Sequence, residues 1–190
     1  MMALATQKRL AWAVTGSGHY LRESLILLKK FHDVDIFLSK AAAEIIKQYD
    51  FQEALDATNH RVYFDKTASS IPVELFYQGQ YHTLVIAPAT SNTVAKMAYG
   101  ISDSLVTNLF AQAGKTSVPS IVFACDTAPE LSSEAPRNHM VMVYPRNVDL
   151  VNVTTLATFD DTQVVADINQ LEVAINTRLH DLTPTAGHNG

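Results

Sequence analysis

Hydrophobic positions along the chain fall into two alternating patterns, short continuous apolar runs and longer stretches with apolar residues at helical spacing. Leu21, Leu25 and Leu28 illustrate the second pattern and predict one buried helix face. The apolar runs predict β-strands at 10–14, 34–39, 83–88, 120–125, 139–144 and 163–166. Helices are expected over 20–31, from 40 onward, and over 92–99, 102–114, 146–158 and 167–180.

Several predicted strands are apolar throughout, which is typical of parallel strands covered on both faces. Strand–helix alternation with such strands predicts an α/β fold, a three-layer α/β/α sandwich around a Rossmann-like, mostly parallel sheet of the flavodoxin-like superfamily. We expect a single domain over 1–182, followed by a disordered tail over 183–190.

Ligands of open α/β sheets collect at the carboxyl ends of the strands. This rule selects four loops, those that follow Val14, Leu38, Ala87 and Ala124.

The first of these loops reads "TGSGHYLRES" and resembles half of a dinucleotide fingerprint. Leu21 stands where a third glycine is expected, and no Gly-Lys-Ser/Thr follows, so the Walker pattern also fails. At the end of the second predicted strand, Ser39 replaces the acid that would hold a ribose. Backbone N–H groups of 16–18 and the Ser39 hydroxyl suit a terminal phosphate. The alternative is an ordinary strand-to-helix turn with glycines for tight packing.

The stretch "APATSNTVAKMAYGISDSLVTNLF" forms a second candidate region, at 87–110. Small residues after Pro88 allow a flat ligand to approach the backbone, and Asn92 and Thr93 offer an amide and a hydroxyl. Each of these polar residues, like Ser102 and Ser104 further on, can equally be a helix N-cap.

Composition narrows the possible partners. The chain has 190 residues, of which 47% are hydrophobic, and a net charge of −5 without a basic stripe, so we expect no nucleic-acid partner. No apolar run reaches the roughly 18–20 residues of a membrane span, so no membrane association is expected. The short apolar stretch after Lys8 and Arg9 leads directly into the glycine loop, so it is interpreted as a strand and not as a signal peptide.

Cys125 is the one cysteine, which excludes an internal disulfide and an iron–sulfur cluster held by this chain alone. We expect no metal site and a cytoplasmic, reducing location. Cys125 itself is more typical of a small buried hydrophobe than of a reactive thiol.

Together, "APATSNT" and "AYGISDSLVTNLF" resemble the paired motifs of the flavin-containing cysteine decarboxylase superfamily of oligomeric FMN proteins. "AWAVTGSGHYLRES", "FLSKAAAEI" and "PRNVDLVNV" are similar to its archaeal-type flavoprotein branch, which includes the dihydromethanopterin reductases. The resemblance implies FMN bound at a subunit interface of a homo-oligomer, a trimer or a larger assembly of trimers. The cofactor-binding residues that it implies are Gly16, Ser17, Gly18, Ser39, Ala89, Thr90, Asn92, Thr93, Ser102 and Leu105.

Two substrate motifs of the decarboxylases are missing. Counting back from Pro88 to the position of their catalytic histidine reaches Glu74, and His82 lies too close to Pro88 to replace it. Where they carry Pro-Ala-Met-Asn, this chain reads "ACDT". A flavin site without that machinery favours redox chemistry over decarboxylation.

The leading hypothesis is an FMN-dependent oxidoreductase that reduces dihydromethanopterin to tetrahydromethanopterin by hydride transfer, with ping-pong kinetics. Its partners would be the reduced pterin and an external electron donor, NAD(P)H-linked or an iron–sulfur protein. No catalytic residue is assigned, and His19, Tyr20, Arg22 and Asp126 are candidates for the substrate pocket. The alternatives are an electron-transfer flavoprotein served by an iron–sulfur partner, a decarboxylase or prenyltransferase, and an FMN-binding module without turnover.

Overall fold

The computed structural model describes residues 8–49, 51–56, 60–66, 70–135 and 139–183. Within them, six strands form one sheet in the order β3-β2-β1-β4-β5-β8, and every neighbouring pair is parallel. The strands are β1 (Arg9–Val14), β2 (Val34–Leu38), β3 (Arg61–Phe64), β4 (Tyr81–Ala89), β5 (Ser120–Ala124) and β8 (Thr162–Val165).

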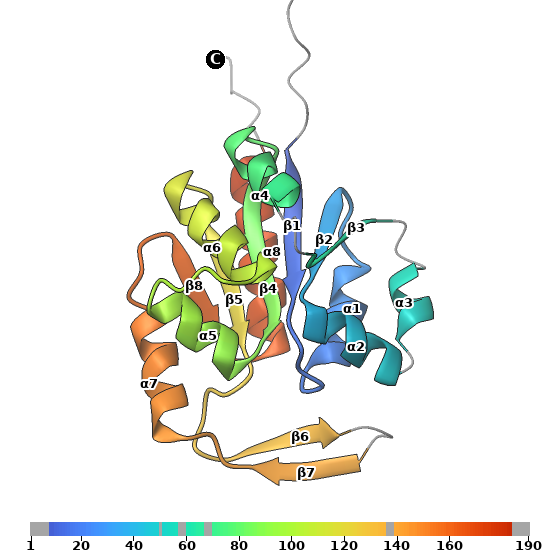
Figure 1. Cartoon of the computed structure of the whole chain (residues 1–190), viewed down its shortest axis with the longest axis vertical. Helices are drawn as coiled ribbons and strands as arrows, with labels where there is room; N and C mark the ends of the chain where they lie inside the picture. Colours follow the sequence, from blue (N-terminus) through green and yellow to red (C-terminus); the bar gives the residue numbers. More distant parts are fainter. Residues whose placement is uncertain (1–7, 50, 57–59, 67–69, 136–138, 184–190) are drawn as a thin grey trace, which may run out of the picture.

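Helices cover both faces of the sheet (Figure 1). They are α1 (Leu21–Leu28), α2 (Lys40–Gln48), α3 (Gln52–Asp56), α4 (Ser70–Tyr77), α5 (Ser91–Ala98), α6 (Leu105–Lys115), α7 (Asn147–Leu156) and α8 (Ile168–Leu182). One core joins one face of the sheet to α1, α2, α3 and α8, and the other joins the opposite face to α4, α5, α6 and α7. Alternate residues of β1 enter the two cores, Trp12 the first and Ala13 the second. The predicted three-layer α/β architecture is confirmed.

The strand order reverses between β1 and β4, because the chain leaves β1 towards one edge and later builds β4, β5 and β8 towards the other. This reversal opens a crevice at the carboxyl ends of the two strands. Thr15 ties the two ends together, since its Oγ1 donates to the Pro88 carbonyl at 2.8 Å and accepts from the Thr90 N–H at 2.9 Å.

The strand predicted at 139–144 is confirmed, but it lies outside the main sheet. The apolar run at 139–144 forms β7 (His139–Val143), which pairs antiparallel with β6 (Leu131–Ala135) and stays outside the main sheet. Figure 1 shows this hairpin beyond the carboxyl ends of the central strands. Apolar content alone does not specify a pairing partner, and the weakly apolar strand β6 carries no pattern that predicts it.

One boundary and one region also differ from expectation. The second helix of the 87–110 region begins at Leu105 and not at 102, because Ser104 is its N-cap and forms a capping box with Thr107. No element was expected between 50 and 80, where α3, β3 and α4 lie. The expected disordered tail lies outside the described residues, except for Thr183.

Candidate functional site

A cavity of about 550 Å³ lies at the carboxyl edge of the sheet, where the strand order reverses. Ordinary small-molecule sites fall in the range of about 300–1,000 Å³. Its walls come from the loops after β1, β4 and β5, from Tyr49, and from the β6–β7 hairpin. The lining residues are Gly16, Ser17, Gly18, His19, Tyr49, Thr90, Ser91, Asn92, Cys125, Asp126, Ser133, Val141, Val143 and Arg146.

Both glycines of the first loop are required by close packing. A Cβ at Gly16 would lie 2.4 Å from the Ala41 Cβ and 3.2–3.3 Å from the Ala41 backbone. A Cβ at Gly18 would lie 2.1 Å from the Tyr49 hydroxyl oxygen. The tight-turn interpretation is therefore correct for these two positions, and it is compatible with ligand binding because the same loop lines the cavity.

The loop also keeps free hydrogen-bond donors. Among the described residues, the backbone N–H groups of Gly16 and Gly18 donate to no protein acceptor. The following helix, α1, begins at Leu21, whose N–H donates to the Gly18 carbonyl at 3.3 Å, and the preceding residue, Tyr20, is left-handed (φ 62°) and provides no side-chain cap. Uncapped N–H groups at the start of a helix form a binding site for an anion such as phosphate.

Two of the predicted hydroxyls serve as helix caps. Ser39 caps α2 by accepting from the Ala42 N–H at 3.0 Å, and Thr90 caps α5 by accepting from the Thr93 N–H at 3.3 Å. Each hydroxyl acts there as an acceptor, and the Ser39 O–H keeps its capacity to donate. Asn92 is not an N-cap, since it lies within α5, where it is exposed and lines the cavity.

The other predicted cofactor contacts lie elsewhere. Ala89 is buried at the end of β4, Thr93 is buried in the first turn of α5, and Leu105 is 1% exposed within the core. Ser102 is exposed and lines a second cavity. The 16–18 loop, Thr90 and Asn92 line one cavity, and Ser39 lies beside the loop, since its N–H donates to the Val14 carbonyl at 3.1 Å. Ser39, Ser102 and Leu105 are not among the lining residues of that cavity.

His19 and Tyr20 follow the glycines and adopt different roles. The two rings are 3.7 Å apart, and the Tyr20 ring stacks on Phe123 of the sheet at 4.6 Å. Tyr20 therefore packs on the protein and does not line the cavity, whereas His19 does. Burial lowers the pKa of His19, and its buried Nε2 has no partner among the described residues. A neutral imidazole with an unpaired nitrogen is available to a ligand.

Arg22 and Cys125 make protein contacts. The Arg22 guanidinium lies 4.8 Å from the centre of the Phe51 ring, and Arg22 does not line the cavity. Cys125 is 4% exposed, its Sγ donates to the Ser17 Oγ at 3.2 Å, and burial raises the pKa of its thiol to about 12. Such a thiol is inert at neutral pH, as expected from the sequence.

Asp126 and Arg146 are the charged residues among those that line the cavity. The Ser91 hydroxyl donates to Asp126 Oδ2, while burial and the Asp149 carboxylate raise the pKa of Asp126. Arg146 is held by Asp149, to which its Nη2 and Nε donate at 2.7 and 2.9 Å. Sequence reasoning missed Arg146, Tyr49 and the hairpin. The motif "PRNVDLVNV", used above only for resemblance, was the one available signal.

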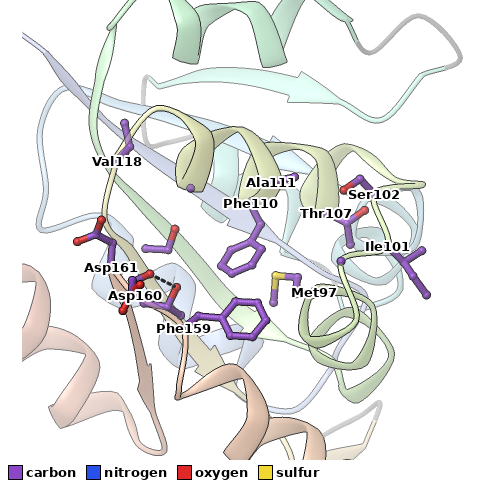
Figure 2. Close-up of a pocket in the computed structure, with 14 residues that line it drawn as sticks. Met97, Ile101, Ser102, Thr107, Phe110, Ala111, Val118, Phe159, Asp160 and Asp161 are labelled. Carbon is purple, nitrogen blue, oxygen red and sulfur yellow. Dashed lines mark hydrogen bonds between the residues drawn. The ribbon is translucent and has the colours of Figure 1, made fainter.

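A second cavity, of about 180 Å³, lies between α5, α6 and the segment before β8 (Figure 2). The Phe110 and Phe159 rings stack 6.4 Å apart beside Met97, and Ser102 lies at the same cavity. Phe159 and Ile101 are 37% and 48% exposed, so this cavity has an apolar mouth open to the surface.

The residues that would stand in for a decarboxylase histidine lie away from the cavity. Glu74 is exposed on α4 and accepts from the Gln78 side chain at 3.2 Å, and His82 lies at the amino end of β4.

Across the described ranges, no group of three or more acidic, histidine or cysteine side chains could hold a metal ion. In the same part of the chain, none of the helices combines the length and apolarity needed to cross a bilayer.

Comparison with solved structures gives a close match to Burkholderia xenovorans DmrB in complex with FMN, described as a cubic protein cage for redox transfer. That chain is 46% identical, with a TM-score of 0.86 over 94% of this chain and 99% of its own. An FMN-dependent cysteine decarboxylase, TvaF, superimposes with a TM-score of 0.64 at 19% identity, which shows a shared fold alone.

Among relatives in sequence, an uncharacterized protein of Methanocaldococcus jannaschii is 34% identical over 88% of this chain and 94% of its own length. The dihydromethanopterin reductase (acceptor) of Methanosarcina mazei is 37% identical over 69% of this chain, and the match spans 60% of that reductase. The Flavoprotein family model matches residues 3–184. The chain therefore belongs to the Flavoprotein family.

Proposed function

We propose that this protein is an FMN-dependent oxidoreductase that reduces dihydromethanopterin to tetrahydromethanopterin. The observation that carries this proposal is the cavity at the reversal of strand order, which combines free N–H donors at one loop with a separate carboxylate. FMN bound there supplies hydride transfer.

The cavity fits the cofactor on three grounds. The free N–H groups of Gly16 and Gly18 and the uncapped start of α1 suit the phosphate. Ser17, Thr90 and Asn92 offer polar groups for the ribityl chain. The unpaired Nε2 of His19 would gain a partner. Val141 and Val143 of the hairpin line the same cavity and would exclude water from the ring.

The pterin substrate is supported by the two dihydromethanopterin reductases among the relatives. The chain spans only 60% and 53% of the lengths of these reductases. The activity of the complete reductases therefore cannot be assigned from the shared region alone. What the chain itself offers is an open cavity with the hydrogen-bonding side chains Asp126 and Arg146.

The substrate class can be tested by reducing the FMN-loaded protein without oxygen and adding dihydromethanopterin or dihydrofolate. We expect the absorbance of oxidised flavin to return upon addition of dihydromethanopterin. Reoxidation by one-electron acceptors, with neither pterin active, would replace the proposal with electron transfer from an iron–sulfur partner. Failure with every pterin, quinone and one-electron acceptor would indicate an FMN-binding module without turnover.

Initial-rate kinetics provide a further prediction. Electron donor and pterin would use the same cavity in alternation, because both would react with the one flavin held in the cavity described above. Double-reciprocal plots at several fixed donor concentrations should therefore give parallel lines. Intersecting lines would require both reactants to be bound at once and would contradict this prediction.

We further propose that the active form is an oligomer. The hairpin face opposite the cavity exposes Met140 and Met142, 57% and 49% exposed, and Tyr144 beyond it is 70% exposed. A two-stranded hairpin is marginally stable by itself, so a second surface that covers these exposed side chains would stabilise it. A second copy that packs its hairpin on the cavity of Figure 2 would place Ser102 at the contact between the two copies.

Met142→Glu tests this assembly. Because a charge would enter the apolar contact, we expect a smaller species in size-exclusion chromatography with light scattering, and a lower FMN content. Val173→Glu is the matched control, since Val173 is 64% exposed on α8, a different surface. An unchanged mass for Met142→Glu, or an equal change for the control, would place the interface elsewhere.

A further inference from the structure

Asp126 supplies the one carboxylate among the residues that line the cavity. It follows β5, two strands along the sheet from the glycine loop at the end of β1. A carboxylate repels a phosphate, so Asp126 must face a part of the bound molecules other than the anion. It needs a ligand group that presents hydrogen-bond donors, N–H or O–H.

The protein does not saturate this carboxylate. Ser91 donates to Oδ2, and Oδ1 has no partner among the described residues. The nearby guanidinium of Arg146 is committed to Asp149 through its Nη2 and Nε. Asp126 is therefore oriented by Ser91 and retains acceptor capacity for a ligand.

The two flat rings that this site would take differ in their donor pattern. The pyrimidine edge of an isoalloxazine has a single N–H between two carbonyl oxygens, so a carboxylate placed there also meets an acceptor. The corresponding edge of a pterin has a ring N–H next to an amino group. These two parallel donors match the two oxygens of a carboxylate, as a guanidinium does.

We propose that Asp126 binds the 2-amino-4-oxo pyrimidine edge of the pterin and so determines specificity for pterins. The inference rests on the proposed function and deepens it. Asp126 discriminates against acceptors without that edge, such as quinones. It does not discriminate between methanopterin and folate types, because both share the edge. Ser91 is a positioning residue that holds the carboxylate.

The test compares Asp126→Asn with the wild type, both loaded with FMN. Asp181→Asn is the matched control, because it removes the same charge from an exposed position on α8. The probes are 6-methylpterin and pteridin-4-one, which lacks the 2-amino group, titrated by difference absorbance of the bound flavin. Hydrogen bonds to a charged group contribute about 1.5–3 kcal/mol, which corresponds to about 10- to 100-fold in Kd.

We expect Asp126→Asn to weaken binding of 6-methylpterin by that factor, while Kd for pteridin-4-one and the FMN content stay unchanged. Equal weakening for both probes, or loss of FMN, would show that Asp126 maintains the site in general and would overturn the assignment. Unchanged binding of 6-methylpterin would overturn it too.

Turnover separates this inference from the proposed function. A wild type that binds 6-methylpterin through Asp126, but whose reduced flavin is not reoxidised by dihydropterins, would contradict the reductase function and leave the assignment intact. A wild type that reduces dihydropterins, with the same KM in Asp126→Asn, would support the function and overturn the assignment.

Discussion

Replacing Asp35 by alanine is expected to lower the free energy of unfolding by about 1–3 kcal/mol, because it leaves the buried Tyr81 hydroxyl and the partly buried Arg9 guanidinium without their acceptor. Asp35 lies on β2 with its side chain fully buried. Its carboxylate accepts from Arg9 Nε at 2.9 Å, from Arg61 Nη2 at 2.7 Å and from the Tyr81 hydroxyl at 2.8 Å. Asp35 thus links the four neighbouring parallel strands β3, β2, β1 and β4 near their amino ends.

Urea unfolding, monitored by circular dichroism at one protein concentration and one FMN loading, measures this loss of unfolding free energy. Asp33→Asn is the control, because Asp33 contacts the same Arg9 at 3.3 Å but is 57% exposed. An exposed ion pair contributes about 0–1 kcal/mol, so the control should lose little. Similar losses for the two variants would contradict the role assigned to burial.

The second large effect is expected at the glycine loop. Gly16→Ala should abolish stable FMN binding, because the new Cβ would meet the Ala41 Cβ at 2.4 Å and the α2 backbone at 3.2–3.3 Å. The loop must then move away from α2, which displaces the N–H groups offered to the phosphate. We expect at least a tenfold rise in Kd for FMN, measured by flavin fluorescence, an effect of about 1.4 kcal/mol or more.

A double variant provides the control for this prediction. Ala41→Gly removes the nearest atom, at a cost of about 1 kcal/mol for glycine within a helix. Gly16→Ala with Ala41→Gly should therefore bind FMN more tightly than Gly16→Ala alone, since contacting positions are not additive. If the double variant were as weak as the single one, contact with Ala41 would not be the cause.

Much of the sheet could be predicted from local pattern. Strands β1, β2, β4 and β5 lie within a few residues of the expected runs, because strands buried on both faces are continuously apolar. The edge strand β8 also lies near its expected run, although most of its residues are only partly buried or exposed. The segment 51–77 escaped prediction because α3 and β3 are short and β3 lies at the sheet edge, where its residues are only partly buried.

The candidate site, like the sheet, could be predicted only in part. The loops at 16–18 and 90–92 follow from turn residues at strand ends, and the structure places both at one cavity. Whether Asn92 or Thr90 caps α5 depends on one residue of helix phase, which composition does not fix. Ser39, Ser102 and Leu105 stay predictions, since none of them is among the residues that line this cavity.

By itself, the sequence determined the α/β class, the candidate loops at the carboxyl ends of the strands and the preference for a phosphate over a dinucleotide. These properties depend on burial period and turn chemistry, which are local. Only the tertiary structure decided that Tyr49 and Ala41 force the two glycines, that the 131–143 hairpin lines the cavity, and that Asp126 keeps a free oxygen. Those facts depend on which distant segments pack together, and local pattern does not encode that choice of partner.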